Sequence, residues 1–287
     1  MAIAESNVLW ARPEAPSRTG ALVLAGSSGR LDAGRADMLA SRGVTALALR
    51  WFGGEGQAMV PCEVPLETFL DAIDLLAGEC DRIVLVGLSY GAEAALLTAT
   101  VDSRVDGVVA LAPTDVVWEG QHRSDHDPRR SKWTHQGRPV AFVPLDRTWE
   151  APSSIPAFVE LYERSREQAP SEAVDAATIP VETFRGDLVL VAGGEDRVWP
   201  SARSARSIAA RRARFGLPTV VVEDQRAGHP IVLPGERPPG FDRPYEVGGD
   251  EGAPQRLGAA AWPAIRSVLG IDSDGTRRHN NRAQNGA

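Results

Sequence analysis

The chain has 287 residues, of which 43% are hydrophobic and 24% charged, a composition typical of folded globular proteins. Its net charge of −7 argues against nucleic acid as a partner, because nucleic-acid-binding domains usually carry a basic excess. No apolar run approaches the ~20 residues of a membrane helix, no signal peptide is recognisable, and the two cysteines form no disulfide framework or zinc motif. We therefore expect a cytoplasmic protein that needs no metal and no cofactor.

Six short apolar runs alternate along the chain with segments of helical periodicity, such as residues 65–76. Because the runs lack polar alternation, they predict the strands of a parallel sheet that is covered on both faces. The runs are 21–25, 44–49, 82–87, 105–112, 187–193 and 218–223. The repeated β-α-β order predicts an α/β fold with a doubly wound, mostly parallel sheet.

The alternation stops between residues 114 and 184, a segment without the pattern of a core strand. It is too long for an ordinary connection, so we expect an insertion that forms a lid over a site, with a helix at 155–168. Residues 254–269 also look helical, although Pro263 predicts a kink or a late start. The polar tail, 272–287, is expected to be disordered, which leaves a single domain over 1–271.

The clearest motif is GLSYG at residues 87–91, directly after a predicted strand and directly before a helical pattern. In that context G-x-S-x-G predicts the nucleophile elbow of the α/β-hydrolase fold. The serine of an elbow occupies a strained turn, and the flanking glycines leave room for the neighbouring backbone. An ordinary turn between strand and helix is the alternative. The motif makes Ser89 the candidate nucleophile.

A serine hydroxyl needs a base, and a histidine is the usual one. His229 directly follows the last predicted strand, where this fold supplies its base. A loop histidine that caps local backbone is the alternative interpretation. The other histidines lie in the insertion or the tail; they are His122, His126, His135 and His279.

The acid that orients the histidine should lie between Ser89 and His229 in the sequence. Asp196 follows the predicted strand 187–193 and precedes Pro200, a helix start, so it is the first candidate. Glu195 is the second candidate. Asp115 is the third, and a helix N-cap is the alternative role for it.

The backbone N–H groups of Tyr90 and Ser27 are the candidate donors of an oxyanion hole. Tyr90 directly follows the candidate nucleophile, and Ser27 lies in the loop after the first predicted strand. A dinucleotide-binding turn is the rival interpretation of that loop. The loop lacks the G-x-G-x-x-G spacing, and no acid follows at the end of the next strand, so this rival is weak.

Several segments together resemble the catalytic domain of acyl-CoA thioester hydrolases and bile acid-CoA:amino acid N-acyltransferases. They are LALRWFGGEG, VPLETFLDAIDLL, GLSYGAEAALLTAT, VVWEG, KWTHQGRPVAFVPL, GGEDRVWPS and AGHPI, which span roughly residues 20–233. The resemblance implies an α/β-hydrolase with Ser89, Asp196 and His229 as its triad. It also implies a thioester or related acyl substrate, such as a coenzyme A thioester.

Ser89 stands where the amidating members of that family carry cysteine, which favours water as the acyl acceptor. The sequence therefore predicts a serine acylhydrolase that works through an acyl-enzyme. A carboxylesterase or dienelactone-type hydrolase, an acyltransferase to an amine, and a catalytically silent binding protein remain the alternatives.

Two clusters in the sequence have both a functional and a structural interpretation. The basic residues of the insertion match coenzyme A phosphates, but a solvated loop balanced by nearby aspartates is the preferred interpretation. The aromatic residues would line an acyl pocket, or simply pack in the core. The basic cluster consists of His122, Arg123, Arg129, Arg130 and Lys132, with Asp125 and Asp127 as the nearby aspartates. The aromatic cluster consists of Trp51, Phe52, Trp118 and Trp133.

Overall fold

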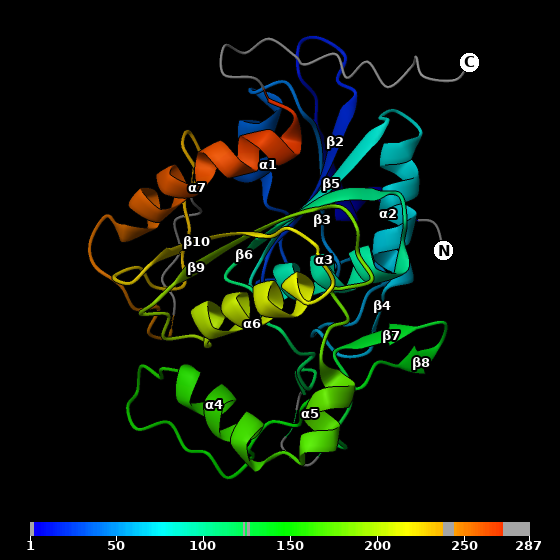
Figure 1. Ribbon diagram of the computed structural model, residues 1–287. Helices are drawn as coiled ribbons and strands as arrows, with labels where there is room; N and C mark the ends of the chain where they lie inside the picture. Colours follow the sequence, from blue (N-terminus) through cyan, green and yellow to red (C-terminus); the bar gives the residue numbers. More distant parts are fainter. Residues whose placement is uncertain (1–2, 123, 125–126, 238–243, 272–287) are drawn as a thin grey trace.

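The computed structural model describes residues 3–122, 124, 127–237 and 244–271, which fold around a seven-stranded sheet with helices on both faces (Figure 1). The strand order is β1-β3-β2-β5-β6-β9-β10. Strand β1 at the edge pairs antiparallel with β3, and every other pairing in this sheet is parallel. The predicted α/β-hydrolase class, with its mostly parallel doubly wound sheet, is confirmed.

All six predicted strands are present, to within two residues at each end. The strand of this sheet that was not predicted is the short edge strand β1, whose four residues are too few to show periodicity. The strands of the sheet are β1 (Val8–Ala11), β2 (Thr19–Leu24), β3 (Thr45–Leu49), β5 (Arg82–Leu88), β6 (Val105–Leu111), β9 (Asp187–Gly193) and β10 (Val220–Asp224).

The helices divide between the two faces of the sheet because successive strand residues point to opposite sides. In β2, Leu22 packs with α2, α3 and α6, whereas Val23 packs with α1 and α7 (Figure 1). These helices and the initial 3-10 turn are η1 (Glu5–Asn7), α1 (Ala33–Ala40), α2 (Glu67–Ala77), α3 (Tyr90–Val101), α6 (Ser201–Ala213) and α7 (Ala253–Leu269). Helix α7 already begins at Ala253, so the late start predicted from Pro263 is wrong.

Residues 114–184 add no strand to the central sheet in the described part of the chain. Two short strands of this insertion, β7 (Trp133–His135) and β8 (Arg138–Pro139), form a separate small sheet with β4 (Val64–Pro65). The insertion also carries α4 (Val159–Gln168), inside the predicted range 155–168, and α5 (Ser171–Ala177). Figure 1 shows α4 and α5 outside the layers of the sheet and its covering helices.

Two expectations from the sequence concern the termini and the surroundings of the chain. The tail 272–287, which we expect to be disordered, lies outside the described residues. No helix in the described ranges combines the length and the apolar content that a membrane crossing requires.

Candidate active site

Ser89 occupies a strained turn between the end of β5 and the start of α3. Its backbone has φ 58° and ψ −121°, a conformation that residues other than glycine rarely adopt. A Cβ on Gly87 would lie 2.1 Å from the carbonyl oxygen of Gly91, and one on Gly91 would lie 2.3 Å from that of Leu24. Both glycines of the motif are therefore required by close backbone contacts, for the reason that the sequence suggested.

Two backbone N–H groups beside Ser89 have no acceptor in the described part of the chain: those of Tyr90 and Ser27. Tyr90 is the first residue of α3, whose positive end points at the serine. The loop that carries Ser27 lies against the serine, since a Cβ on Gly26 would be 3.1 Å from Cβ of Ser89. The positive end of α3 at the serine would stabilise a negative charge that develops there.

Asp196 and His229 are in direct contact at the carboxyl ends of two strands of the sheet. Asp196 follows β9 and His229 follows β10, the neighbouring parallel strand. The Asp196 Oδ2 atom lies 2.8 Å from His229 Nδ1, and both side chains are buried. Since Nδ1 faces the carboxylate, Nε2 is the ring nitrogen left for a second partner.

Three further donors hold the carboxylate of Asp196. Its Oδ1 atom accepts the backbone N–H groups of Val198 at 2.8 Å and Trp199 at 3.2 Å. Its Oδ2 atom also accepts the hydroxyl of Ser201 at 2.6 Å. The carboxylate can therefore turn little, and it fixes the orientation of the imidazole of His229.

One backbone carbonyl joins the loops of Asp196 and His229. The Val247 oxygen accepts the N–H of His229 at 2.8 Å and that of Arg197 at 3.4 Å. The preceding residue, Glu246, donates its N–H to the Pro156 oxygen of the insertion at 2.9 Å. The acid loop, the base loop and the segment before α4 therefore meet at residues 246–247.

Ser89 and His229 are linked through two aromatic rings. The Trp199 ring lies 5.6 Å from that of Tyr90 and 6.0 Å from that of His229, between ring centres. In the described residues no hydrogen bond joins the Ser89 hydroxyl to the imidazole. In hydrolases without ligand this contact is often long and shortens when substrate binds.

The structure separates Asp196 from the other two acid candidates. Glu195 is exposed to solvent. Asp115 is buried and is bound by Arg166 of α4 at 2.7 and 2.9 Å, so it is neither the partner of the histidine nor a helix N-cap. Burial opposes ionisation of Asp115, but Arg166 outweighs it and holds the pKa of the carboxyl below its ordinary value. Asp115 instead fastens α4 to the segment that directly follows β6.

The remaining histidines are not part of this group. His122 Nε2 lies 2.8 Å from Glu119, and His135 Nδ1 lies 3.2 Å from Glu67, both away from Asp196. His126 and His279 lie outside the described residues.

The expectation of a solvated basic loop is wrong for Lys132, which is fully buried and pairs with the buried Glu93 of α3 at 2.6 Å. Arg130 and Arg129 pair with glutamates rather than with the aspartates named from the sequence: Glu63 at 2.7 Å and Glu119 at 2.5 Å. Arg123 and Asp125 lie outside the described residues. The charges of this segment are therefore largely neutralised within the protein.

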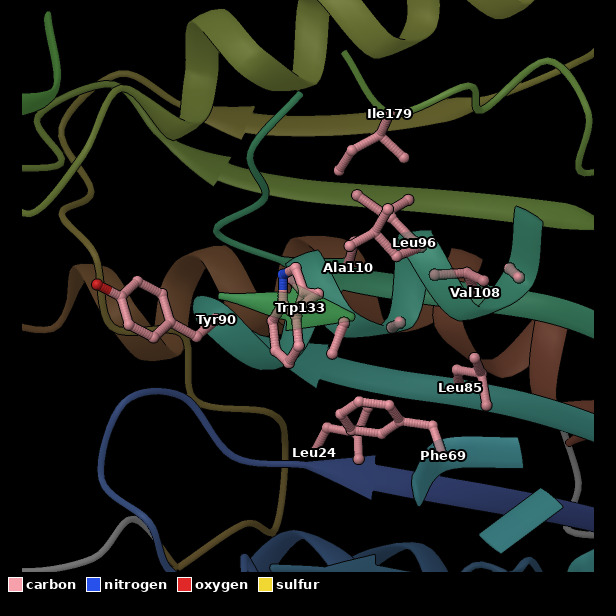
Figure 2. Packing of buried hydrophobic residues seen from close by; sticks show 14 of the residues in the cluster. Leu24, Phe69, Leu85, Tyr90, Leu96, Val108, Ala110, Trp133 and Ile179 are labelled. Atoms are coloured by element: carbon pink, nitrogen blue, oxygen red, sulfur yellow. The ribbon is translucent and has the colours of Figure 1, made fainter. Parts of the chain in front are cut away.

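The predicted aromatic residues divide into two groups. Trp51 packs in the core on Phe52 and on Trp133, with ring centres 4.6 and 5.1 Å apart, which agrees with the packing interpretation. Figure 2 shows Trp133 among other buried residues of this core. Trp118 instead packs on Tyr162 of α4 at 4.8 Å. Tyr162, Trp199 and Ser201 contact the candidate site and were missed. Tyr162 comes from the distant α4, whereas Trp199 and Ser201 follow Asp196 closely but carry no motif that marks them.

This arrangement of a nucleophile elbow, an acid and a histidine at the carboxyl ends of parallel strands defines an α/β hydrolase. Residues 22–243 match the model of the alpha/beta hydrolase family, and the chain belongs to that family. None of the curated proteins matches the sequence.

Solved structures with the same fold share little sequence with this chain. A proposed dienelactone hydrolase from Klebsiella pneumoniae matches over 91% of both chains, with 12% identity and a TM-score of 0.53. A puromycin-hydrolysing peptidase from Mycobacterium tuberculosis matches over 91% of this chain and 35% of its own, with 16% identity and a TM-score of 0.55. An acylaminoacyl peptidase from Pyrococcus horikoshii matches over 80% of this chain and 36% of its own, with 12% identity and a TM-score of 0.53. The chain thus spans about a third of the length of the two peptidases.

Proposed function

We propose that the protein is a serine acylhydrolase with Ser89 as nucleophile, His229 as base and Asp196 as the orienting acid. The observation that carries the proposal is the contact of 2.8 Å between Asp196 and His229. This contact lies at the carboxyl ends of the strands, where Ser89 also occupies its strained turn. The N–H groups of Tyr90 and Ser27, which have no acceptor in the described part of the chain, would supply the remaining element, an oxyanion hole.

In the proposed reaction, Ser89 Oγ attacks the acyl carbonyl carbon while His229 Nε2 accepts the hydroxyl proton. Asp196 stays ionised and stabilises the imidazolium. The N–H groups of Tyr90 and Ser27 hold the negative charge on the carbonyl oxygen, a contribution of about 2.7–4 kcal/mol for each donor by analogy with other hydrolases. The leaving thiol or alcohol takes the proton from His229. Water, activated by the same histidine, then cleaves the acyl-enzyme.

The proposed substrate is an acyl thioester, which the sequence resemblance to acyl-CoA thioester hydrolases supports. An oxygen ester is the second candidate, favoured by the likeness to a proposed dienelactone hydrolase along 91% of both chains. The basic segment 129–132 gives a coenzyme A carrier no support, because its charges are paired with Glu63, Glu93 and Glu119. A phosphate-bearing carrier would need other contacts.

A fluorophosphonate probe tests the nucleophile. We expect covalent labelling of the folded protein at Ser89 and none of the Ser89→Ala variant. Hydrolysis of N-acetylcysteamine thioesters and matched ethyl esters, followed with and without a free amino acid, then distinguishes the candidate reactions. If the folded protein resists the probe and cleaves no substrate, a binding protein replaces the enzyme. An acyl-amino acid product would instead identify an acyltransferase.

A further inference from the structure

The hydroxyl groups of Tyr90 and Tyr162 form a buried pair beside the candidate nucleophile. Their oxygens lie 2.9 Å apart, and both side chains are more than nine-tenths buried. Tyr90 directly follows Ser89 and points beyond the carboxyl end of β5 (Figure 2), while Tyr162 comes from α4 of the insertion. The pair therefore joins the insertion to the elbow.

Among the residues that the structure describes, one hydrogen of this pair has no acceptor. Two phenol groups that share one hydrogen bond use one of their two protons, whichever of them donates. Neither hydroxyl has a second hydrogen-bond partner within the described ranges of the chain. Burial raises the pKa of the Tyr162 phenol well above its ordinary value, so this group keeps its proton. A buried donor without an acceptor is costly unless a ligand supplies one.

A fully buried ion pair, Lys132 with Glu93, contacts the face of the Tyr90 ring. Lys132 Nζ, the amine of the chain's one lysine, lies 3.5 Å from the centre of that ring, within cation–π range. Glu93 holds Lys132 at 2.6 Å and accepts the indole N–H of Trp133 at 2.8 Å. Buried ion pairs contribute little net stability compared with apolar residues of the same shape, so this one calls for another role.

The hydroxyl pair also lies close to the base. The Trp199 ring contacts Tyr162, with ring centres 5.7 Å apart, and contacts His229 at 6.0 Å. Trp199 is itself fixed, since its indole N–H donates to the Ala112 oxygen at 3.1 Å. The unpaired phenolic proton is therefore placed among groups that adjoin both Ser89 and His229.

We propose that the Tyr90 and Tyr162 hydroxyls form a hydrogen-bonding subsite for an oxygen atom on the acyl part of the substrate, and that Lys132 positions Tyr90 for this contact. The proposal rests on the proposed function and narrows its substrate class. The preferred acyl groups carry a carbonyl, carboxylate or hydroxyl oxygen near the scissile carbonyl. Such sites discriminate strongly, because a substrate without the oxygen leaves a buried donor unpaired.

The test compares oxygen-bearing thioesters with an unsubstituted one. N-acetylcysteamine thioesters of 3-oxobutanoate, 3-hydroxybutanoate, 4-oxopentanoate and succinate are each measured against the butanoate thioester. The kcat/KM ratio of each pair is determined for the wild type and for the Tyr90→Phe, Tyr162→Phe double variant, so that intrinsic reactivity cancels. We expect the double variant to lose about 10- to 100-fold of the ratio for at least one oxygen-bearing substrate. Ratios that agree within threefold for all four substrates would overturn the subsite.

The positioning role of Lys132 has its own variant and control. Lys132→Met is combined with Glu93→Gln so that no buried charge is left without a partner. We expect the same loss of the ratio as in the double phenylalanine variant. Arg212→Met is the matched control, because Arg212 is also fully buried but binds carbonyl oxygens remote from the site, such as that of Phe184 at 2.5 Å. An unchanged ratio in the Lys132 variant, or an equal loss in the Arg212 control, would refute the positioning role.

The two proposals fail in different ways. If the fluorophosphonate labels Ser89 and butanoate is cleaved, but the ratios do not change, only the subsite is wrong. If Ser89 is not labelled and no thioester is cleaved, the proposed function is wrong and the subsite is rejected with it. Thermal unfolding of every variant establishes that the compared proteins are folded.

Discussion

Replacing Asp196 by asparagine keeps the shape of the acid and removes its charge. In the structure Oδ1 accepts two backbone N–H groups, from Val198 and Trp199, while Oδ2 faces Ser201 and the Nδ1 atom of His229. The amide oxygen of an asparagine would take the Oδ1 position, because the backbone N–H groups need an acceptor there. Its NH2 group would then face His229.

The replacement of an acceptor by a donor next to His229 determines how far kcat falls. An NH2 group that donates to Nδ1 of His229 places the ring proton on Nε2, where it prevents acceptance of the Ser89 proton. The same substitution in a serine protease lowers kcat about 10⁴-fold through the wrong tautomer. We expect a comparable loss here, equivalent to about 5 kcal/mol of transition-state stabilisation.

The assay is steady-state hydrolysis of a thioester or ester that the wild type cleaves, with circular dichroism as evidence of folding. Glu195→Gln is the matched control, since it removes the neighbouring carboxylate, which is exposed and outside the hydrogen-bond network of His229. We expect its kcat to remain within about twofold of the wild type, as for surface substitutions in general. A loss below tenfold for Asp196→Asn, or an equal loss for the control, would refute the reasoning.

Three further predictions follow from the same geometry. His229→Ala should abolish turnover of short acyl thioesters and leave the circular dichroism spectrum unchanged; near-normal rates would exclude this residue as the base. Gly91→Ala should destabilise the fold by at least about 3 kcal/mol, measured by urea unfolding, because its Cβ would lie 2.3 Å from the Leu24 oxygen. Asp115 stabilises the fold above the unfolded pKa of about 4, and this stability is lost as pH falls through its lower folded pKa. Arg166→Met should therefore reduce the unfolding free energy more at pH 7 than at pH 3, and an equal reduction at both would contradict the ion pair.

The sheet and the elbow could be predicted because their causes are local in the sequence. A buried parallel strand must be apolar on both faces, so runs such as 82–87 are recognisable without knowledge of their neighbours. The glycines around Ser89 are required by contacts within one turn and with the adjacent strand β2. Two glycines at fixed spacing therefore indicate the tight turn of the backbone at Ser89.

The groups around the site could not be predicted, because they depend on contacts between distant segments. Lys132 was assigned to a solvated loop from its basic neighbours, yet it pairs with Glu93, 39 residues earlier in the chain. Tyr162 meets Tyr90 from 72 residues away. The choice between Glu195 and Asp196 was also open, since adjacent residues after a strand differ only in the direction that the folded loop gives them.

The shared carbonyl of Val247 has a consequence for substitutions far from the catalytic groups. Because the loops of Asp196 and His229 both donate to this one oxygen, a substitution that displaces the segment 246–247 would disturb the acid and the base together. The insertion is joined to the same segment at Pro156, so a change in the insertion can reach both residues through this contact.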